Sequence, residues 1–255
     1  MTTVRRALAP NGGPYTGPGT NTWVVGDGAA RVVIDPGPDR ADHRRAIERR
    51  LGGAAVGVVL LTHGHADHSE GAERFAAEQG ARLLRHPELA DGDLIHAADI
   101  TLQAIFTPGH APDHLAYWLP EDRVLFTGDL ILGQGSSMVT YPDGDVAAYL
   151  RSLDRVAALE PRLLFPGHWD PVEDAAAKIA GYKAHRLERE RLVVDALREA
   201  PGTPGELTER VYAGELATDP SLRQGAEMTL RAHLEKLVRE GRVAVEGGEV
   251  QRLVR

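Results

Sequence analysis

The sequence has 255 residues, of which 42% are hydrophobic and 26% charged, with a formal net charge of −8 and no cysteine. This length and composition predict one large domain, or a medium domain followed by a small one. The lack of cysteine excludes disulfides, thiolate metal sites and a cysteine nucleophile. No run approaches the roughly 18 apolar residues of a membrane helix. No apolar segment of the secretory kind follows Arg5 and Arg6, so we expect a cytoplasmic protein.

The acidic charge is not evenly spread along the chain. Residues 183–255 hold 13 cationic and 13 acidic side chains, so the whole net charge of −8 falls on residues 1–182. Neither part has the cationic excess that drives binding to a phosphate backbone. This distribution counts against a protein whose main ligand is nucleic acid.

Short strands and helices alternate through the first 165 residues, after a Gly- and Pro-rich loop at 10–19. The predicted strands are 22–25, 30–34, 56–61, 82–84, 100–106, 115–119, 124–127 and 163–165. The predicted helices are 42–51, 69–79 and 146–158. The run at 56–61 is continuously apolar, which is typical of a strand buried on both faces. Runs of antiparallel strands with helices predict an α/β sandwich.

The pattern changes near residue 172. A long helix is predicted over 172–200, ending at Pro201-Gly202, and two more over 203–212 and 222–240. Strands at 242–245 and 250–254 then flank Gly247-Gly248, a favourable hairpin turn. Three helices and a hairpin follow the plan of a winged helix. We therefore predict two domains, residues 1–180 and residues 181–255.

Seven side chains with metal-binding chemistry stand out. Four of them fall within six residues directly after the apolar run, and three more follow later predicted strands, each preceded by a glycine. They are His63, His65, Asp67, His68, His110, Asp129 and His168. Imidazole and carboxylate ligands without thiolate suit Zn²⁺, Mn²⁺ or Fe²⁺. The isolated histidines, which we expect to be structural, are His43, His86, His185 and His233.

This set of residues resembles the motifs of the metallo-β-lactamase superfamily. The resemblance implies a four-layer αβ/βα sandwich with two metal ions at one edge. By motif position, the first ion would be held by His63, His65 and His110, and the second by Asp67, His68 and His168, with Asp129 between them. Asp35, in the Ile-Asp-Pro-Gly turn, matches the family's supporting aspartate behind the ligands.

The chemistry of such a centre is hydrolytic. Two metal ions that share a water lower its pKa toward neutrality, and the resulting bridging hydroxide attacks a carbonyl or phosphorus. Asp67 can also orient that hydroxide or take its proton. Outer groups must fix the imidazoles, and we expect Asp35 and His114 to do so. A partly buried structural histidine is the alternative for His114.

Several branches of the superfamily fit poorly. Classical zinc β-lactamases commonly use a cysteine where this chain has Asp129, and the di-iron oxygen reductases have Glu in place of His65. The chain best resembles the lactamase-B-like group with a C-terminal winged helix, through Pro18–Thr22, the Thr-Pro-Gly-His motif and the tail. This resemblance predicts hydrolysis of a small-molecule ester or thioester. The alternatives are a single-strand endoribonuclease and a DNA-binding regulator with a vestigial hydrolase domain.

Two further expectations concern the surroundings of the site. We expect Thr20, Asn21 and Trp169 to line the substrate cleft. Trp169 stands where the family commonly has glycine, so its indole would either narrow the cleft for a smaller or flatter substrate or pack against the tail. The predicted helix 222–240 mixes four cations with three glutamates. This mixture favours a structural role for the tail, as a cleft cover or a homodimer contact, over nucleic-acid binding.

Overall fold

The computed structural model describes residues 1–252 and separates the chain into two compact units. The first unit comprises Met1–Pro108, Asp113–Ser137 and Ser152–Ile179, and the second comprises Gly109–Pro112, Met138–Arg151 and the chain from Ala180 onward. Among the described residues, no helix has the length and apolar character needed to cross a membrane.

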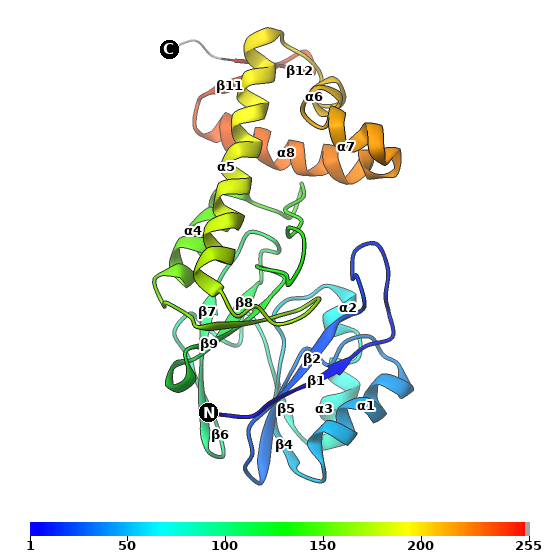
Figure 1. Ribbon diagram of the computed structural model, residues 1–255, viewed down its shortest axis with the longest axis vertical. Coiled ribbons are helices and arrows are strands. Elements are labelled where there is room, and N and C mark those ends of the chain that lie inside the picture. The colour runs from blue at the N-terminus through cyan, green and yellow to red at the C-terminus, as the bar shows by residue number, and fades with distance from the viewer. Residues whose placement is uncertain (253–255) are drawn as a thin grey trace. The chain divides into compact units, whose positions relative to one another are not determined.

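The first unit contains two five-stranded sheets, and the first sheet has the order β1-β2-β3-β4-β5. Its strands are β1 (Val4–Leu8), β2 (Asn21–Val25), β3 (Ala30–Ile34), β4 (Ala55–Leu60) and β5 (Arg82–Leu84). The pairs β3–β4 and β4–β5 are parallel, with helices α1 (Ala41–Leu51) and α3 (Ala72–Gln79) in the connections. Figure 1 shows strands β1, β2, β4 and β5 of this sheet together with helices α1 and α3. Parallel strands end at the same edge, so the residues after β3 and β4 are neighbours.

The second sheet has the order β10-β9-β8-β7-β6. Its strands are β6 (Leu94–Ala97), β7 (Ile100–Phe106), β8 (Leu115–Leu119), β9 (Val124–Gly128) and β10 (Leu163–Pro166). The short helix η1 (Pro120–Asp122) joins β8 to β9, and α4 (Val146–Ala157) precedes β10. β8 is antiparallel to both β7 and β9, whereas β10 is parallel to β9. Strands β7, β9 and β10 therefore run in one direction and end at one edge.

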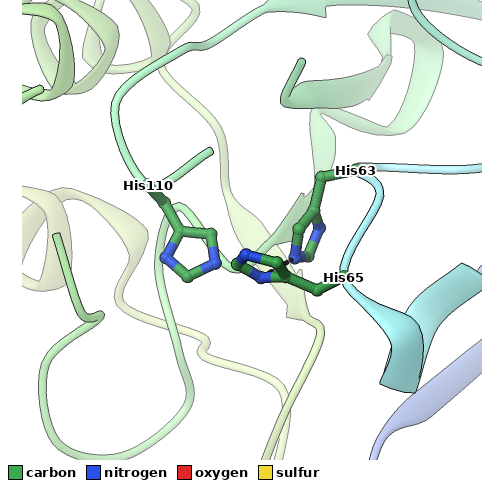
Figure 2. Close-up of side chains that lie close together, drawn as sticks. All are labelled: His63, His65 and His110. Carbon is green, nitrogen blue, oxygen red and sulfur yellow. Dashed lines mark hydrogen bonds between the residues drawn. The ribbon is translucent and has the colours of Figure 1, made fainter. Parts of the chain in front are cut away.

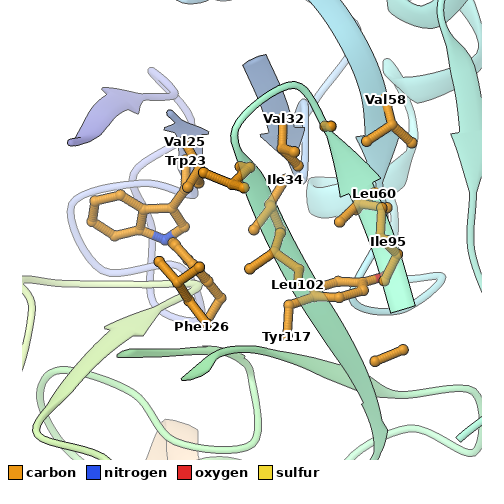
Figure 3. Packing of buried hydrophobic residues seen from close by; sticks show 14 of the residues in the cluster. Trp23, Val25, Val32, Ile34, Val58, Leu60, Ile95, Leu102, Tyr117 and Phe126 are labelled. Atoms are coloured by element: carbon orange, nitrogen blue, oxygen red, sulfur yellow. The ribbon is translucent and has the colours of Figure 1, made fainter. Parts of the chain in front are cut away.

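Alternating side chains of both sheets meet in the central core (Figure 3). The side chains from the first sheet include Trp23, Val25, Val32, Ile34, Val58 and Leu60, and those from the second include Leu102, Tyr117 and Phe126. The indole of Trp23 also meets the ring of Phe165 edge-on, with 4.7 Å between centroids. The predicted α/β sandwich is confirmed.

The other face of the first sheet is buried by helices. Val33 and Val59 point to this face and pack with Ile47 of α1 and Phe75 of α3. Because successive residues of a strand face opposite sides, burial of both faces requires apolar residues throughout. This explains the continuous apolar run that the sequence shows at 56–61.

The second unit contains the predicted helices and hairpin. Its elements are α5 (Ala175–Glu199, which begins in the first unit), α6 (Pro204–Val211), α7 (Ala213–Thr218), η2 (Pro220–Leu222), α8 (Arg223–Arg239), β11 (Val243–Glu246) and β12 (Glu249–Arg252). Thr203 and Glu206 form a capping box at the start of α6, which satisfies backbone N–H groups that have no partner within the helix. Leu207, Leu230 and Leu234 lie in the core of this unit.

Some boundaries differ from the sequence prediction. Where one helix was predicted over 69–79, the chain forms two: α2 (Ala66–Ser69) ends at residue 69, and α3 begins at Ala72 after a turn at Gly71. A side chain at Gly71 would place its Cβ 3.1 Å from the carbonyl oxygen of Gly37. The prediction missed strands β1 and β6 and helix α7, which are short and lack a clear apolar period. Residues 253–254 of the predicted last strand lie outside the described residues.

His233 is buried in α8 with 0% exposure, and neither ring nitrogen has a hydrogen-bond partner among the described residues. Burial, together with the smaller effect of the nearby cations Arg186, Lys236 and Arg189, lowers the pKa of His233 to about 3. The folded state therefore keeps this imidazole neutral.

We predict that His233 makes the protein acid-sensitive. The unfolded chain takes up this proton below about pH 6.5 while the folded state does so only near pH 3, so stability falls as the pH drops through this window. Between pH 6.5 and 5 the loss is about 1.6 kcal/mol. His233→Leu should flatten this part of the pH dependence of the unfolding free energy, measured by urea titration and circular dichroism. His96→Leu, at an exposed position, should keep the wild-type slope, and an unchanged slope in His233→Leu would contradict the prediction.

Candidate metal centre

The seven predicted ligands lie where strands of the two sheets end. His63 and His65 follow β4, and His65 is the N-cap of α2, which carries Asp67 and His68. The three later side chains follow the ends of β7, β9 and β10, the three strands that run in one direction. The strand directions therefore explain why residues 63 and 168 can share one site.

The structure brings all seven into three overlapping groups whose ligand atoms lie within 4.8 Å of one another. The groups are His63, His65 and His110 (Figure 2), then His63, His68 and Asp129, and finally Asp67, His68 and His168. In the first group, His63 Nε2 lies 2.9 Å from His65 Nδ1. His63 and His68 each belong to two groups, so the groups form one continuous cluster.

The spacing of the third group fits a metal ion. Asp67 Oδ2 lies 3.3 Å from His68 Nε2 and 3.3 Å from His168 Nε2, and the two imidazole nitrogens are 3.3 Å apart. Tetrahedral zinc ligands at about 2.0–2.1 Å from the ion are about 3.3 Å from one another. Asp129 contributes one carboxylate oxygen 3.5 Å from His68 Nε2 and the other 3.3 Å from His168 Nε2. The donor set and its spacing suit a cation.

Backbone carbonyls fix the orientation of two of the imidazoles. His168 Nδ1 donates to the carbonyl of Gly19 at 3.1 Å, and His110 Nδ1 donates to that of Met138 at 2.6 Å. Since a carbonyl only accepts, the proton must be on Nδ1, and this leaves the Nε2 lone pair for a metal.

Asp35, the predicted supporting residue, lies directly against the cluster. It is 1% exposed, and its Oδ2 lies 2.9 Å from His68 Nδ1. It also accepts from the backbone N–H of Thr62 at 2.8 Å and from the Thr62 hydroxyl at 2.7 Å. Asp35 thus joins the end of β3 to the loop in which the cluster begins. The backbone φ of Asp35 itself is 52°.

His114 holds a different part of the site. Its ring is fully buried, its Nε2 accepts from the backbone N–H of Asp129 at 3.2 Å, and its Nδ1 lies 2.8 Å from the Thr107 hydroxyl. His114 therefore touches the main chain of Asp129 and acts on the position of the carboxylate through it.

The negative charge of the clustered carboxylates also favours a bound cation. Burial lowers the pKa of His168, but the adjacent Asp129 carboxylate outweighs it and raises the pKa to about 9. Burial likewise opposes charge on Asp129, yet His68 and His168 hold the pKa of that carboxyl well below its usual value. Without a metal, protons on the imidazoles neutralise the buried carboxylates, and a divalent cation can take their place.

The residues predicted to line the cleft have different surroundings. Thr20 and Asn21 are 0% exposed. The Asn21 amide donates to the carbonyls of Pro166 and Trp169, so it ties β2 to the loop after β10. Trp169 is half-buried, and its indole lies so close to Gly17 that a Cβ there would collide with the ring. Because Thr20 and Asn21 are fully buried, their side chains support the loops around the site from beneath the surface. Trp169 stays a predicted cleft residue.

Comparison with known proteins agrees with this geometry. The profile of the Metallo-beta-lactamase superfamily matches residues 15–91 and 87–168, and that of the Beta-lactamase associated winged helix domain matches residues 203–251. This chain belongs to the metallo-β-lactamase superfamily. Within the superfamily, it is 35% identical over 275 residues to the lactamase-like protein adaB of Aspergillus niger, covering 98% of this chain and 84% of that protein.

Two further relatives extend the comparison. The chain is 33% identical over 244 residues to an atrochrysone carboxyl ACP thioesterase of Aspergillus fumigatus, covering 85% of this chain and 75% of that protein. The crystal structure of a metallo-beta-lactamase family protein from Thermus thermophilus superposes with a TM-score of 0.82 at 25% identity, covering 98% of both chains. The chain is thus a hydrolase of the metallo-β-lactamase fold with a C-terminal winged helix, as predicted.

Asp129→Ala tests the metal centre directly. Because Asp129 lies within 3.5 Å of both His68 and His168, we expect its loss to lower the metal content below two ions per chain and activity by more than about 100-fold. Metal content is measured by elemental analysis of metal-loaded protein. Asp170→Ala, whose parent carboxylate is 85% exposed and pairs with Arg6, should behave as wild type. Two bound ions and full activity in Asp129→Ala would refute the assignment.

Proposed function

We propose that this metallo-β-lactamase-fold hydrolase cleaves an acyl ester or thioester, using two divalent metal ions held by the seven clustered side chains. The gathering of all seven donors into one continuous cluster carries this proposal. The bond type is supported by relatives described as ACP thioesterases, which are 33% identical to this chain over 85% and 95% of its length. Zn²⁺ is the first candidate for both ions, with Mn²⁺ and Fe²⁺ as alternatives.

The two metal ions would supply an acidified water and polarise the substrate carbonyl. The chain's own groups have distinct tasks. Asp67 has a side chain 29% exposed, against 12% for Asp129. Asp67 is therefore the carboxylate that a water and a substrate reach, and we assign it the orientation and deprotonation of the attacking water. In thioester hydrolysis that water's oxygen would bond to the acyl carbon and the C–S bond would break. The proton that Asp67 takes from the water would pass to the leaving sulfur, so that a carboxylic acid and a thiol are released.

The structure gives little support to the endoribonuclease alternative. Each of the four cations that the sequence places on α8 is paired with an acidic side chain. The pairs are Arg223–Glu209, Arg231–Glu227, Lys236–Glu190 and Arg239–Asp145. Binding a phosphate backbone needs cations that release counterions, and paired cations do this poorly. The same pairs disfavour a DNA-binding regulator. A homodimer through the C-terminal domain stays a prediction, as do the domain limits at residues 1–180 and 181–255.

Thioester hydrolysis is tested with metal-loaded protein and a panel of acyl thioesters, including acyl groups on an acyl carrier protein. We expect release of free thiol, followed with a thiol reagent, and loss of turnover after chelation. Restoration by Zn²⁺ or Mn²⁺ separates metal removal from unfolding. Turnover of another bond type, with no turnover of esters or thioesters by the same metal-loaded sample, would overturn the proposal.

The nucleic-acid alternative has its own measurement. We expect the metal-loaded protein neither to cleave single-stranded RNA nor to retain RNA or DNA at low salt. A dissociation constant for nucleic acid that weakens steeply with salt would instead indicate phosphate contacts. If Arg231→Ala and Arg239→Ala both reduced that salt dependence, the nucleic-acid function would replace the thioesterase proposal.

A further inference from the structure

The Thr20 side chain lies directly against a predicted ligand. Its hydroxyl Oγ1 is 3.1 Å from Asp67 Oδ2, and the residue is 0% exposed. Asp67 Oδ2 is the same oxygen that lies 3.3 Å from both His68 Nε2 and His168 Nε2. The buried hydrogen bond from Thr20 therefore affects how the Asp67 carboxylate is oriented toward His68 and His168.

The direction of this hydrogen bond follows from its other partner, Asn11. The backbone N–H of Thr20 lies 2.9 Å from the Asn11 side-chain oxygen, and the Asn11 amide nitrogen lies 2.9 Å from Thr20 Oγ1. A backbone N–H only donates, so the oxygen of the Asn11 amide must face it, and the amide NH₂ then donates to the Thr20 hydroxyl. The single hydroxyl proton is left for Asp67. The chain of donors therefore runs from Asn11 through Thr20 to Asp67.

The loop that carries Asn11 and Thr20 is held rigidly. The Thr16 hydroxyl donates to the Asn11 carbonyl at 2.6 Å, and the Ala9 N–H donates to the Thr20 carbonyl at 2.8 Å. Gly19 has a φ of +136°, and a Cβ there would collide with the Ala9 oxygen. The Gly19 carbonyl accepts from His168 Nδ1, so one loop orients two of the three donors in the third group.

We propose that Thr20 and Asn11 are positioning residues of the metal centre, which fix the rotation of the Asp67 carboxylate by a hydrogen bond of set direction. A carboxylate turns freely about its terminal bond unless its oxygens are held, and groups that hold metal ligands from outside commonly change metal affinity or activity by about 10–100-fold. This inference rests on the proposed metal centre but not on the thioester substrate.

Four variants test it. Thr20→Val removes the hydroxyl at constant shape, and Thr20→Ser keeps it. Asn11→Asp keeps the shape but replaces the amide donor by a carboxylate oxygen, which would draw the Thr20 hydroxyl proton away from Asp67. Thr16→Val is the matched control, since it removes a hydrogen bond to the Asn11 backbone in the same loop without altering the donor chain.

The measurements are Zn²⁺ affinity by chelator competition, the visible spectrum of the Co²⁺-loaded protein, and kcat and KM. For Thr20→Val and Asn11→Asp we expect the weaker ion to bind about 10–100-fold less tightly. The Co²⁺ spectrum should change and kcat should fall in proportion, with KM within about twofold. Thr20→Ser and Thr16→Val should resemble wild type.

Wild-type metal affinity and spectrum in Thr20→Val would overturn the inference. If Thr20→Val fails to fold by circular dichroism, Asn11→Asp decides the question, and wild-type behaviour there would overturn the donor direction and the inference with it. Affinity and spectrum are measured without substrate. A failure of the thioester assay alone would therefore leave the inference standing, and unaltered metal binding in a folded variant would refute it alone.

Discussion

The Asp35 carboxylate is the contact on which the site's geometry depends. It is buried at the end of β3 and accepts hydrogen bonds from both the backbone and the hydroxyl of Thr62, at the end of the neighbouring parallel strand. The same group holds His68 at 2.9 Å. A buried carboxylate with these partners stabilises the structure only if all of them stay in place. The relative position of two strand ends is thereby linked to the direction of one imidazole.

Burial and charge act together beyond Asp35. Asp129 and His68 are buried, where an unpaired charge is costly. The cluster nevertheless has two carboxylates within about hydrogen-bond distance of the same imidazoles. Such a site is stable when positive charge is present, either as protons on His68 and His168 or as metal ions. The arrangement therefore couples folding of the strand ends to cation binding.

The cluster of candidate ligands was predictable from sequence for two reasons. Side chains with metal-binding chemistry at such short, specific spacing have no packing explanation, and the apolar pattern located the strands that precede them. The contacts of Thr20 and Asn11 with the cluster were not predictable from sequence. Asn11 is 56 residues from Asp67 in sequence, and the two are joined only through a loop that returns so that Asn11 meets Thr20. Composition marks that loop as irregular without giving its path. The role of Met138 was equally hidden, since a backbone carbonyl has no sequence signal.

In the winged helix, the structure adds what a count of charges along the sequence cannot give, namely the partner of each cation. Within the second unit, Arg239 of α8 pairs with Asp145 at 2.8 Å, and the Met228 carbonyl accepts from the backbone N–H of Tyr141. Both contacts hold the segment Met138–Arg151, whose first residue orients His110. Arg239 cannot pair with Asp145 and neutralise a phosphate at the same time. The contacts of α8 therefore favour a helix that supports, in its own unit, the segment holding the candidate ligand His110, over a helix that binds nucleic acid.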